Sequence, residues 1–279
     1  MVHLMVTLNE RYLRPLTLML YSLLQADAEE YTVYLCHRGL TPAQIARLEE
    51  DLDCPRCQLV PVEVKEQFLE GMPLGHYPPE MYDRLFAPRL LPEELDRVLY
   101  LDPDIIVLGP LGELYRMELG DSLMAAATHV REALRRLNQL RLGMSPQGLY
   151  INSGVMVMNL TRMRQLQRPQ MVLEYLEQHR RHLWLPDQDL ISGLYGDQIL
   201  QLDSWKWNMT ERLYAMQPGR RERVGISWVR ENSAIIHYCG RGKPWKGRYL
   251  GSLDVFYKEA EAAFYRSGRC LPPLEPEEH

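Results

Sequence analysis

The segment Arg97-Val-Leu-Tyr-Leu-Asp-Pro-Asp-Ile-Ile-Val107 brings two carboxylates, Asp102 and Asp104, to the end of an apolar run. We predict a buried strand over residues 97–101, and side chains two positions apart in a strand point to the same side. Two acids on one side of a buried strand end repel each other and lose hydration. A cation between them would relieve both costs, and carboxylate oxygens suit Mg²⁺ and Mn²⁺. The segment therefore predicts a metal that binds an anion, usually a phosphate. A structural pair that caps the turn is the alternative.

Strands and helices alternate through the residues that precede this segment. Apolar runs predict strands, and helical spacing with a Thr41-Pro42 start signal predicts helices. The expected strands cover 3–8, 31–36, 58–64 and 97–101, and the expected helices cover 11–24, a segment from Thr41 to Leu52, and 79–91. Such alternation is typical of parallel strands with crossover helices, in which ligands bind at the C-terminal strand ends. Asp102 and Asp104 follow one of these ends.

The second half of the chain is less regular, and it contains no internal repeat and no clear linker. We expect strands at 122–127, 154–159 and 234–238, and helices at 168–182, 187–195 and 253–266. Residues 271–279, with three prolines and three acids, are expected to be frayed. These elements predict one α/β domain, not several.

Composition limits the classes of partner. The chain has 279 residues and a net charge of −5, so no general attraction to nucleic acid follows. Five cysteines without a secretion signal argue against a disulfide framework, and no apolar stretch is long enough to span a bilayer. We therefore expect a soluble cytoplasmic protein. Two groups of basic residues are interpreted as solvated faces, namely Arg131, Arg135, Arg136 and Arg141, and Arg220, Arg221 and Arg223.

Three further motifs carry polar groups that could bind a ligand. His237-Tyr-Cys-Gly-Arg-Gly-Lys-Pro-Trp245 supplies an imidazole, two glycines that let backbone approach a ligand, and a lysine that can neutralise phosphate. A histidine added to two carboxylates shifts the metal preference from Mg²⁺ towards Mn²⁺. Asn152-Ser-Gly-Val155 and Asp187-Gln-Asp189 could present amides and a carboxylate to sugar hydroxyls. Taken singly, His237 is more often a structural histidine and the Asn152 motif more often a plain turn, whereas Asp187 could equally cap a helix or bind a hydroxyl.

In their order and spacing, the four motifs resemble glycosyltransferase family 8, the retaining class that includes lipopolysaccharide galactosyl- and glucosyltransferases and glycogenin. The resemblance extends from the first strand to about Lys246, and the segments Tyr82–Leu85 and Asn208-Met209 also match family positions. It implies a GT-A-type single Rossmann-like α/β domain with a mostly parallel central sheet and flanking helices. We expect this catalytic domain to cover residues 1–250, followed by a small C-terminal helical segment and tail at 251–279.

The resemblance also implies the site. Asp102, Asp104 and His237 would hold Mn²⁺, or alternatively Mg²⁺, on the diphosphate of UDP-glucose or UDP-galactose. The other donor-binding residues would be Lys243, Gly240 and Cys239 at the diphosphate, Arg84, Asn152, Ser153, Asp187 and Gln188 around the sugar, and Thr7, Asn9 and Tyr12 at the uridine. The family usually has an aspartate at the position of Asn9. It also often has an acid near the sugar that Thr128-His129 lacks.

For the chemistry, we expect front-side attack by a hydroxyl of a glycan or lipid-linked acceptor. Gln188 would lie beneath the anomeric carbon and Asp187 would orient the sugar. Two alternatives remain open: a catalytically inactive carbohydrate- or nucleotide-sugar-binding protein, and a metal-dependent phosphohydrolase. The basic and aromatic helix expected at 253–266 could make weak peripheral contact with a membrane.

Overall fold

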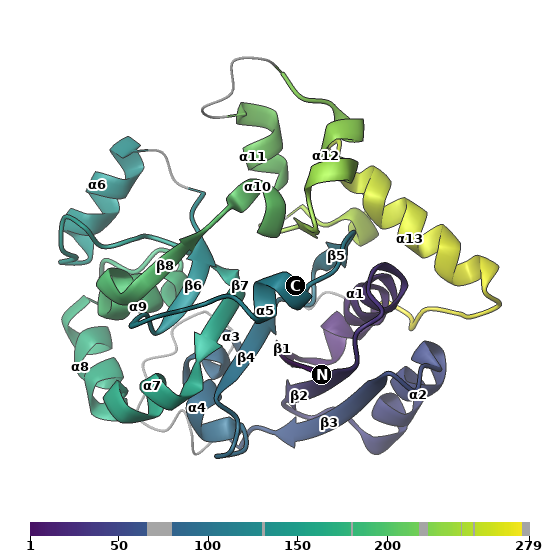
Figure 1. The fold of residues 1–279 in the computed structure, drawn as a ribbon, viewed down its shortest axis with the longest axis horizontal. Coiled ribbons are helices and arrows are strands. Elements are labelled where there is room, and N and C mark those ends of the chain that lie inside the picture. The colour runs from purple at the N-terminus through teal and green to yellow at the C-terminus, as the bar shows by residue number, and fades with distance from the viewer. Residues whose placement is uncertain are drawn as a thin grey trace.

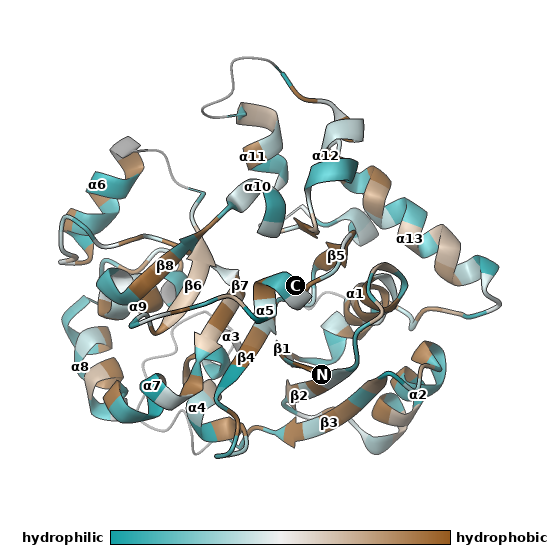
Figure 2. Cartoon of the chain, viewed as in Figure 1, coloured by the Kyte–Doolittle hydropathy of each residue, from teal (hydrophilic) through white to brown (hydrophobic). Residues whose placement is uncertain are grey.

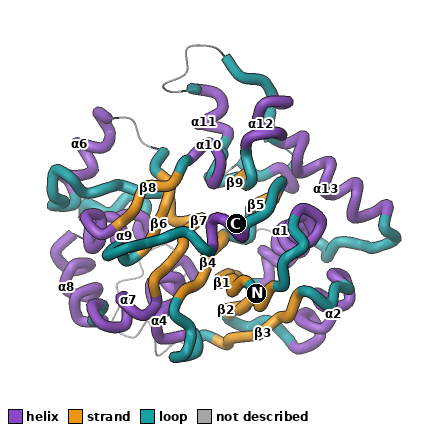
Figure 3. The backbone as a smooth tube through the Cα atoms, viewed as in Figure 1, coloured by secondary structure: helices purple, strands orange, loops and turns teal. Residues whose placement is uncertain are grey.

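A twisted sheet occupies the middle of the molecule and helices surround it (Figures 1 and 3). The computed structural model describes residues 1–65, 80–129, 132–179, 181–217, 223–240, 242–247 and 249–274. Within these ranges the sheet has seven strands in the order β3-β2-β1-β4-β7-β6-β8, and a second ladder joins β5 to β9. The strands are β1 (Val2–Leu8), β2 (Tyr31–His37), β3 (Cys57–Glu63), β4 (Arg97–Leu101), β5 (Ile105–Val107), β6 (Met124–Ala127), β7 (Asn152–Asn159), β8 (Ile199–Leu202) and β9 (Ile235–His237).

The predicted, mostly parallel sheet is confirmed. The pairs β1–β2, β2–β3, β1–β4 and β6–β8 are parallel, whereas β7 runs antiparallel to both of its neighbours. Because alternate strand residues face opposite sides, the sheet separates two apolar clusters. Leu99 and Leu101 belong to one cluster, and Val98 and Tyr100 belong to the other. In the hydropathy view the strands show brown and beige stretches interrupted by paler or teal residues (Figure 2).

The helices that flank the sheet are described in three groups. The first group is α1 (Leu13–Ala26) and α2 (Pro42–Leu52), which lie beside β1, β2 and β3 (Figure 1). The second is α3 (Glu80–Asp83), α4 (Ala87–Leu90), α7 (Leu160–Leu166), α8 (Pro169–His179) and α9 (Pro186–Tyr195). The remaining helices are α5 (Gly112–Tyr115), α6 (Glu132–Arg141), α10 (Ser204–Trp207), α11 (Glu211–Met216), α12 (Ile226–Asn232) and α13 (Asp254–Arg266).

The sequence signals explain several of these boundaries. Thr41 and Gln44 form a reciprocal capping box at the start of α2, in which Pro42 occupies the first helical position. The helix expected at 79–91 is instead broken. Within its described part, α3 is followed by a 3₁₀ turn, η3 (Arg84–Phe86), and then by α4, whose second residue is Pro88. Pro88 has no N–H to donate to the Arg84 carbonyl four residues earlier, and its ring would clash with that carbonyl in a continuous helix, which explains the interruption.

The strand expected at 97–101 is confirmed as β4 with the same bounds, but the structure departs from expectation in two details. Asp102 and Asp104 do not continue β4, because a bend from Asp102 to Asp104 separates β4 from β5. The strands β5 and β8 were not expected at all, since three or four apolar residues give too short a pattern to recognise. The predicted elements at 3–8, 31–36, 58–64, 154–159 and 253–266 agree with the structure to within two residues.

The C-terminal helix α13 packs on α1. Phe264 meets Tyr21 edge to face with ring centroids 5.0 Å apart, and Arg14 pairs with Glu261 at 2.9 Å. Phe256, Tyr257 and Phe264 are buried, so among the aromatic residues of this helix only Tyr265 is exposed. A membrane contact would therefore depend on Tyr265 and the basic side chains. No helix in the described part of the chain combines the length and the apolar character that a membrane span requires.

Asp27, which follows α1, ties three segments together. Its carboxylate accepts hydrogen bonds from Tyr31 Oη at 2.6 Å, the Leu111 amide at 2.8 Å and the Glu29 amide at 3.0 Å. Burial alone would raise the pKa of this carboxyl. The donated hydrogen bonds outweigh burial, so its pKa lies below the ordinary value of 3.8.

We predict that Asp27→Asn lowers the free energy of unfolding by about 1–3 kcal/mol at neutral pH, because an amide nitrogen cannot accept these hydrogen bonds. A carboxyl with a lowered folded-state pKa stabilises the fold above its unfolded pKa, and this stabilisation is lost as the pH falls through the folded value. The difference between variant and wild type should therefore shrink below about pH 4. Urea unfolding at several pH values measures it. Asp53→Asn, at a residue whose side chain is 86% exposed, is the control. Equal losses in both variants would contradict the role of Asp27.

Candidate active site

The bend after β4 carries both acids of the Asp-Pro-Asp motif. The Asp102 amide donates to the Gly154 carbonyl of β7 at 2.8 Å, and the Asp104 carbonyl accepts from the Tyr238 amide at 3.0 Å. The first contact anchors the bend to the main sheet, and the second anchors it to the segment after β9. The two side chains are thereby turned to the same side by a bend, not by strand alternation.

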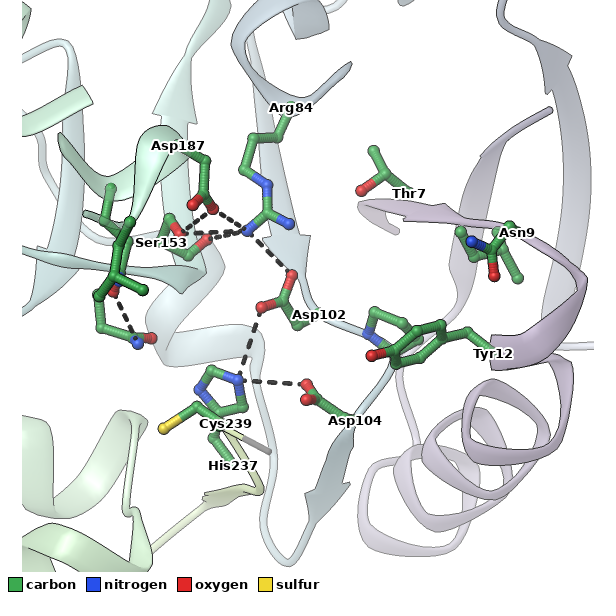
Figure 4. A pocket seen from close by; sticks show the side chains of 16 residues that line it. Thr7, Asn9, Tyr12, Arg84, Asp102, Asp104, Ser153, Asp187, His237 and Cys239 are labelled. Atoms are coloured by element: carbon green, nitrogen blue, oxygen red, sulfur yellow. Dashed lines mark hydrogen bonds and ion pairs between the residues drawn. The ribbon is translucent and has the colours of Figure 1, made fainter. Parts of the chain in front are cut away.

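His237 faces both carboxylates from the end of β9. The register of the second ladder pairs His237 with Ile105, next to Asp104. Its Nε2 lies 3.2 Å from Asp104 Oδ1 and 3.5 Å from Asp102 Oδ2 (Figure 4). The three residues can each offer one ligand atom such that all these atoms lie within 4.8 Å of one another. The structure thus brings together the three residues that the sequence predicts as metal ligands.

A divalent cation fits this arrangement. Asp104 Oδ1 and His237 Nε2 are buried and have no hydrogen-bond partner, although buried polar atoms are normally satisfied. Residue 154 must also be small. A Cβ atom on Gly154 would lie 2.2 Å from His237 Cε1 and 2.7 Å from Asp102 Oδ2. The donor set of two carboxylates and an imidazole suits Mn²⁺ better than Mg²⁺.

Two permanently charged cations flank the acids. Lys243, which is buried, donates to Asp104 Oδ2 and to the Tyr238 carbonyl, the latter at 2.8 Å. Arg84, from the 3₁₀ turn η3, lies 3.0 Å from Asp102 Oδ1 and 3.1 Å from Asp187 Oδ2. These cations reduce the repulsion between carboxylates that burial would otherwise strengthen.

The same charges set the protonation of the cluster. Burial would lower the pKa of His237, but Asp104 and Asp102 outweigh it and raise that pKa to about 10. Burial would raise the pKa of Asp104, and Lys243 and His237 outweigh it and lower it. A proton on Nε2 and a metal ion would occupy the same space between the carboxylates. A metal ion held by these residues would therefore take the place of that proton.

A pocket of about 260 Å³ opens at this cluster (Figure 4). Most of the residues that the sequence predicts as donor-binding line it, and three residues that were not predicted, Leu8, Pro103 and Leu185, line it as well. The predicted lining residues are Thr7, Asn9, Tyr12, Arg84, Asp102, Asn152, Ser153, Asp187, Gln188, Cys239 and Gly240, together with the metal-ligand candidates Asp104 and His237. Lys243 does not line the pocket but reaches it through Asp104.

One wall of the pocket presents amide and hydroxyl groups. Asn152 Nδ2 donates to Gln188 Oε1 at 3.0 Å, and Ser153 Oγ donates to Asp187 Oδ2 at 2.6 Å. These residues come from the start of β7 and the first turn of α9. At the opposite end, Thr7, Asn9 and Tyr12 come from β1 and the turn that follows it (Figure 4).

Asp189 belongs to the fold and not to the pocket. It is fully buried, pairs with Arg141 at 2.7 Å, and accepts from Tyr150 Oη and from the Trp184 amide. The interpretation of Arg141 as part of a solvated face was therefore wrong, because its side chain is only 5% exposed. Among the basic residues interpreted in the same way, Arg131, Arg220 and Arg221 lie outside the described residues.

Tyr100 was not predicted to belong to the site. Its hydroxyl donates to Asp102 Oδ1 at 2.8 Å and lies 2.9 Å from Thr7 Oγ1, and its ring lies under the Arg84 guanidinium at 4.7 Å. The position of Tyr100, two residues before Asp102, could have indicated this contact. A tyrosine in an apolar strand is, however, normally interpreted as a core residue.

Known proteins share this sequence and fold. A family model, Glycosyl transferase family 8, matches residues 3–248. The chain is 28% identical to General stress protein A of Bacillus subtilis over 88% of this chain and 87% of that protein. It is 30% identical to a lipopolysaccharide 1,2-glucosyltransferase of Escherichia coli K12 over 64% of this chain and 53%, about half, of that enzyme.

Solved structures show the same architecture. The galactosyltransferase LgtC, in complex with donor and acceptor sugar analogues, superposes with a TM-score of 0.78 at 24% identity, covering 94% of this chain and 96% of LgtC. An active-site mutant of LgtC gives a TM-score of 0.80 at 23% identity over the same shares. The fold is therefore of the GT-A type. With the family model matched across nearly the whole described sheet and its pocket, the chain belongs to glycosyltransferase family 8.

Proposed function

We propose that this chain is a retaining hexosyltransferase that moves glucose or galactose from a UDP-sugar to a hydroxyl group of a glycan or lipid-linked acceptor, with Mn²⁺ bound to Asp102, Asp104 and His237. Mg²⁺ is the alternative ion. The observation that carries the proposal is the convergence at the pocket of one possible ligand atom each from Asp102, Asp104 and His237, all within 4.8 Å of one another. Because the chain belongs to glycosyltransferase family 8, we expect this site to catalyse sugar transfer.

The diphosphate would lie against the acids and the segment after β9. A divalent cation, when bound, neutralises the negative charge that develops on the leaving diphosphate. With a metal ion bound to Asp104, Lys243 would add a second positive charge beside the diphosphate. Gly240 adopts a positive φ of 97°, a conformation that glycine reaches without strain, and so lets the backbone next to Cys239 turn at the pocket.

The hexose would lie on the polar wall. Arg84, Asn152, Ser153, Asp187 and Gln188 offer charged, amide and hydroxyl groups to sugar hydroxyls. The uridine would take the opposite end, where Tyr12 offers a ring face and Asn9 can pair with a uracil edge as donor or acceptor. Thr7 would complete this end of the pocket.

Retention of configuration would follow from front-side attack. Asp187 is buried and its Oδ2 is already engaged by Ser153 Oγ and Arg84, so it is held as an orienting group instead of a free nucleophile. Gln188 is anchored through Oε1 to Asn152 and would lie beneath the anomeric carbon. A cation-like carbon is stabilised there by the amide dipole.

The domain boundary and the acceptor side belong to the same proposal. Residues 1–250 would form the catalytic domain, and residues 251–279 would form a C-terminal segment whose helix packs Phe264 against Tyr21 of α1. An acceptor at a membrane surface would meet Tyr265 and the basic residues of this helix, of which Lys258 has a side chain that is 69% exposed.

The function is tested by UDP release from UDP-glucose and UDP-galactose with Mn²⁺, in the presence of a panel of glycan acceptors. We expect transfer from one of the two donors, and Asp104→Asn should lower Mn²⁺-dependent turnover at least about 100-fold while the protein stays folded. Asp121→Asn, at a residue 98% exposed, is the matched control. Wild-type turnover in Asp104→Asn would contradict the metal assignment. Tight UDP binding without turnover would favour a binding protein, and phosphate release would favour a phosphohydrolase.

We further expect no covalent sugar on the enzyme during turnover, because Asp187 is engaged by two donors. Mass spectrometry of the intact protein, quenched during reaction with a slow fluorinated donor, measures it, and NMR of the product gives its anomeric configuration. A glycosyl adduct on Asp187 would contradict front-side attack. An inverted product would contradict retention.

A further inference from the structure

A chain of side-chain hydrogen bonds connects the metal-ligand candidate His237 to Gln188. His237 Nδ1 lies 2.9 Å from Asn208 Oδ1, Asn208 Nδ2 lies 2.9 Å from Asn152 Oδ1, and Asn152 Nδ2 lies 3.0 Å from Gln188 Oε1. Asn208 stands in the middle, is fully buried and does not line the pocket. It therefore touches neither donor nor metal.

One backbone amide determines the direction of every bond in this chain. The Gly154 N–H donates to Asn152 Oδ1 at 3.1 Å, and a backbone N–H can only donate. Oδ1 must therefore be the oxygen of Asn152, so the Asn208 atom that faces it must be the nitrogen. The Asn208 oxygen is left to face His237.

At His237, this direction selects the useful tautomer. Because Asn208 Oδ1 can only accept, Nδ1 must carry a proton and donate it. The lone pair of the neutral imidazole then lies on Nε2, the atom that faces Asp102 and Asp104. Partners of this kind on metal-ligating histidines set the tautomer and the ring orientation.

At Gln188, the same direction orients the amide. Asn152 uses its nitrogen towards Gln188, so the Gln188 atom that receives it must be the oxygen. The oxygen keeps a second lone pair for the pocket. A reversed amide would present a donor to a carbon that becomes positive.

The backbone of Asn208 is itself held in place. Its amide donates to the Ser204 carbonyl at 3.2 Å, and its carbonyl lies 2.8 Å from Nε2 of the half-buried His129. The next residue, Met209, bridges to β9 and accepts the His237 amide at 2.8 Å. Asn208 and His237 are thus fixed relative to each other by backbone as well as by side chains.

We propose that Asn208 is a positioning residue that couples the two halves of the active site, setting the His237 tautomer through its oxygen and the Gln188 amide through its nitrogen and Asn152. This inference rests on the proposed function, in which His237 binds the metal and Gln188 faces the sugar. It assigns a task to a buried residue that contacts neither.

Two substitutions separate the contact of Asn208 with His237 from its contact with Asn152. Asn208→Ala removes both contacts, so Mn²⁺ affinity should fall about 10- to 100-fold and kcat should fall as well. Asn208→Asp keeps an acceptor for His237 but presents oxygen to Asn152 Oδ1. Its Mn²⁺ affinity should not be weakened by more than about threefold, whereas kcat should fall about tenfold or more. Calorimetry measures Mn²⁺ binding without turnover, and thermal melting reports folding.

Asn232→Asp makes the same chemical change at an exposed asparagine and should leave both quantities unchanged. Wild-type Mn²⁺ affinity in Asn208→Ala, or wild-type kcat in Asn208→Asp, would overturn the positioning role proposed for Asn208. A wild-type protein that neither binds Mn²⁺ nor releases UDP would instead overturn the proposed function, so the two failures are distinguishable.

A measurement on the wild type keeps the proposal testable if the variants do not fold. Long-range ¹H–¹⁵N spectra, recorded with and without diamagnetic Mg²⁺, should show a proton on His237 Nδ1 in both states. An unprotonated Nδ1 in either state would overturn the proposal, because Asn208 would then have to donate to His237 and the chain of bonds would run in the opposite direction.

Discussion

The repulsion between Asp102 and Asp104 is the constraint on which the site depends. Two carboxylates brought to one buried position cost several kcal/mol unless positive charge compensates them. The protein supplies that charge from separate parts of the chain, through Arg84 before β4 and Lys243 after β9. Between them, His237 holds either a proton or, as we propose, shares a metal ion with the acids. A buried charge cluster of this kind is unfavourable for folding, which makes it a candidate for binding or chemistry.

The fold provides the means of assembling that cluster. The parallel arrangement of β1, β2 and β4 brings the ends of β1 and β4 to one edge, and hence Thr7 and Asn9 near the acids. The antiparallel β7 delivers Asn152 and Ser153 from the opposite direction, and the short β5–β9 ladder delivers His237. Each of these strands is held by main-chain hydrogen bonds, which fix the positions of the side chains that it carries. The close approach of β7 to His237 is what requires glycine at 154.

The sequence identified residues that the fold brings together at the pocket better than it identified the contacts between them. Motifs with recognisable residue types, such as Asp102-Pro-Asp104 and the histidine at the end of β9, identified groups that the fold brings together. Contacts between distant segments left no comparable signal. Asn208 matched a family position, but no role for it was predicted from the sequence. Arg141 was interpreted as solvated because its partner, Asp189, lies 48 residues away in the sequence. Short strands such as β5 escaped prediction because their stability comes from partners elsewhere in the chain.

The central claim is that Asp102, Asp104 and His237 together bind one divalent cation, and crystallography with Mn²⁺ and UDP tests it most directly. Anomalous diffraction at the manganese edge should give a single strong peak about 2.0–2.3 Å from an oxygen of each carboxylate and from His237 Nε2. A peak elsewhere would contradict the account. So would a UDP complex in which saturating Mn²⁺ gives no peak among these three residues.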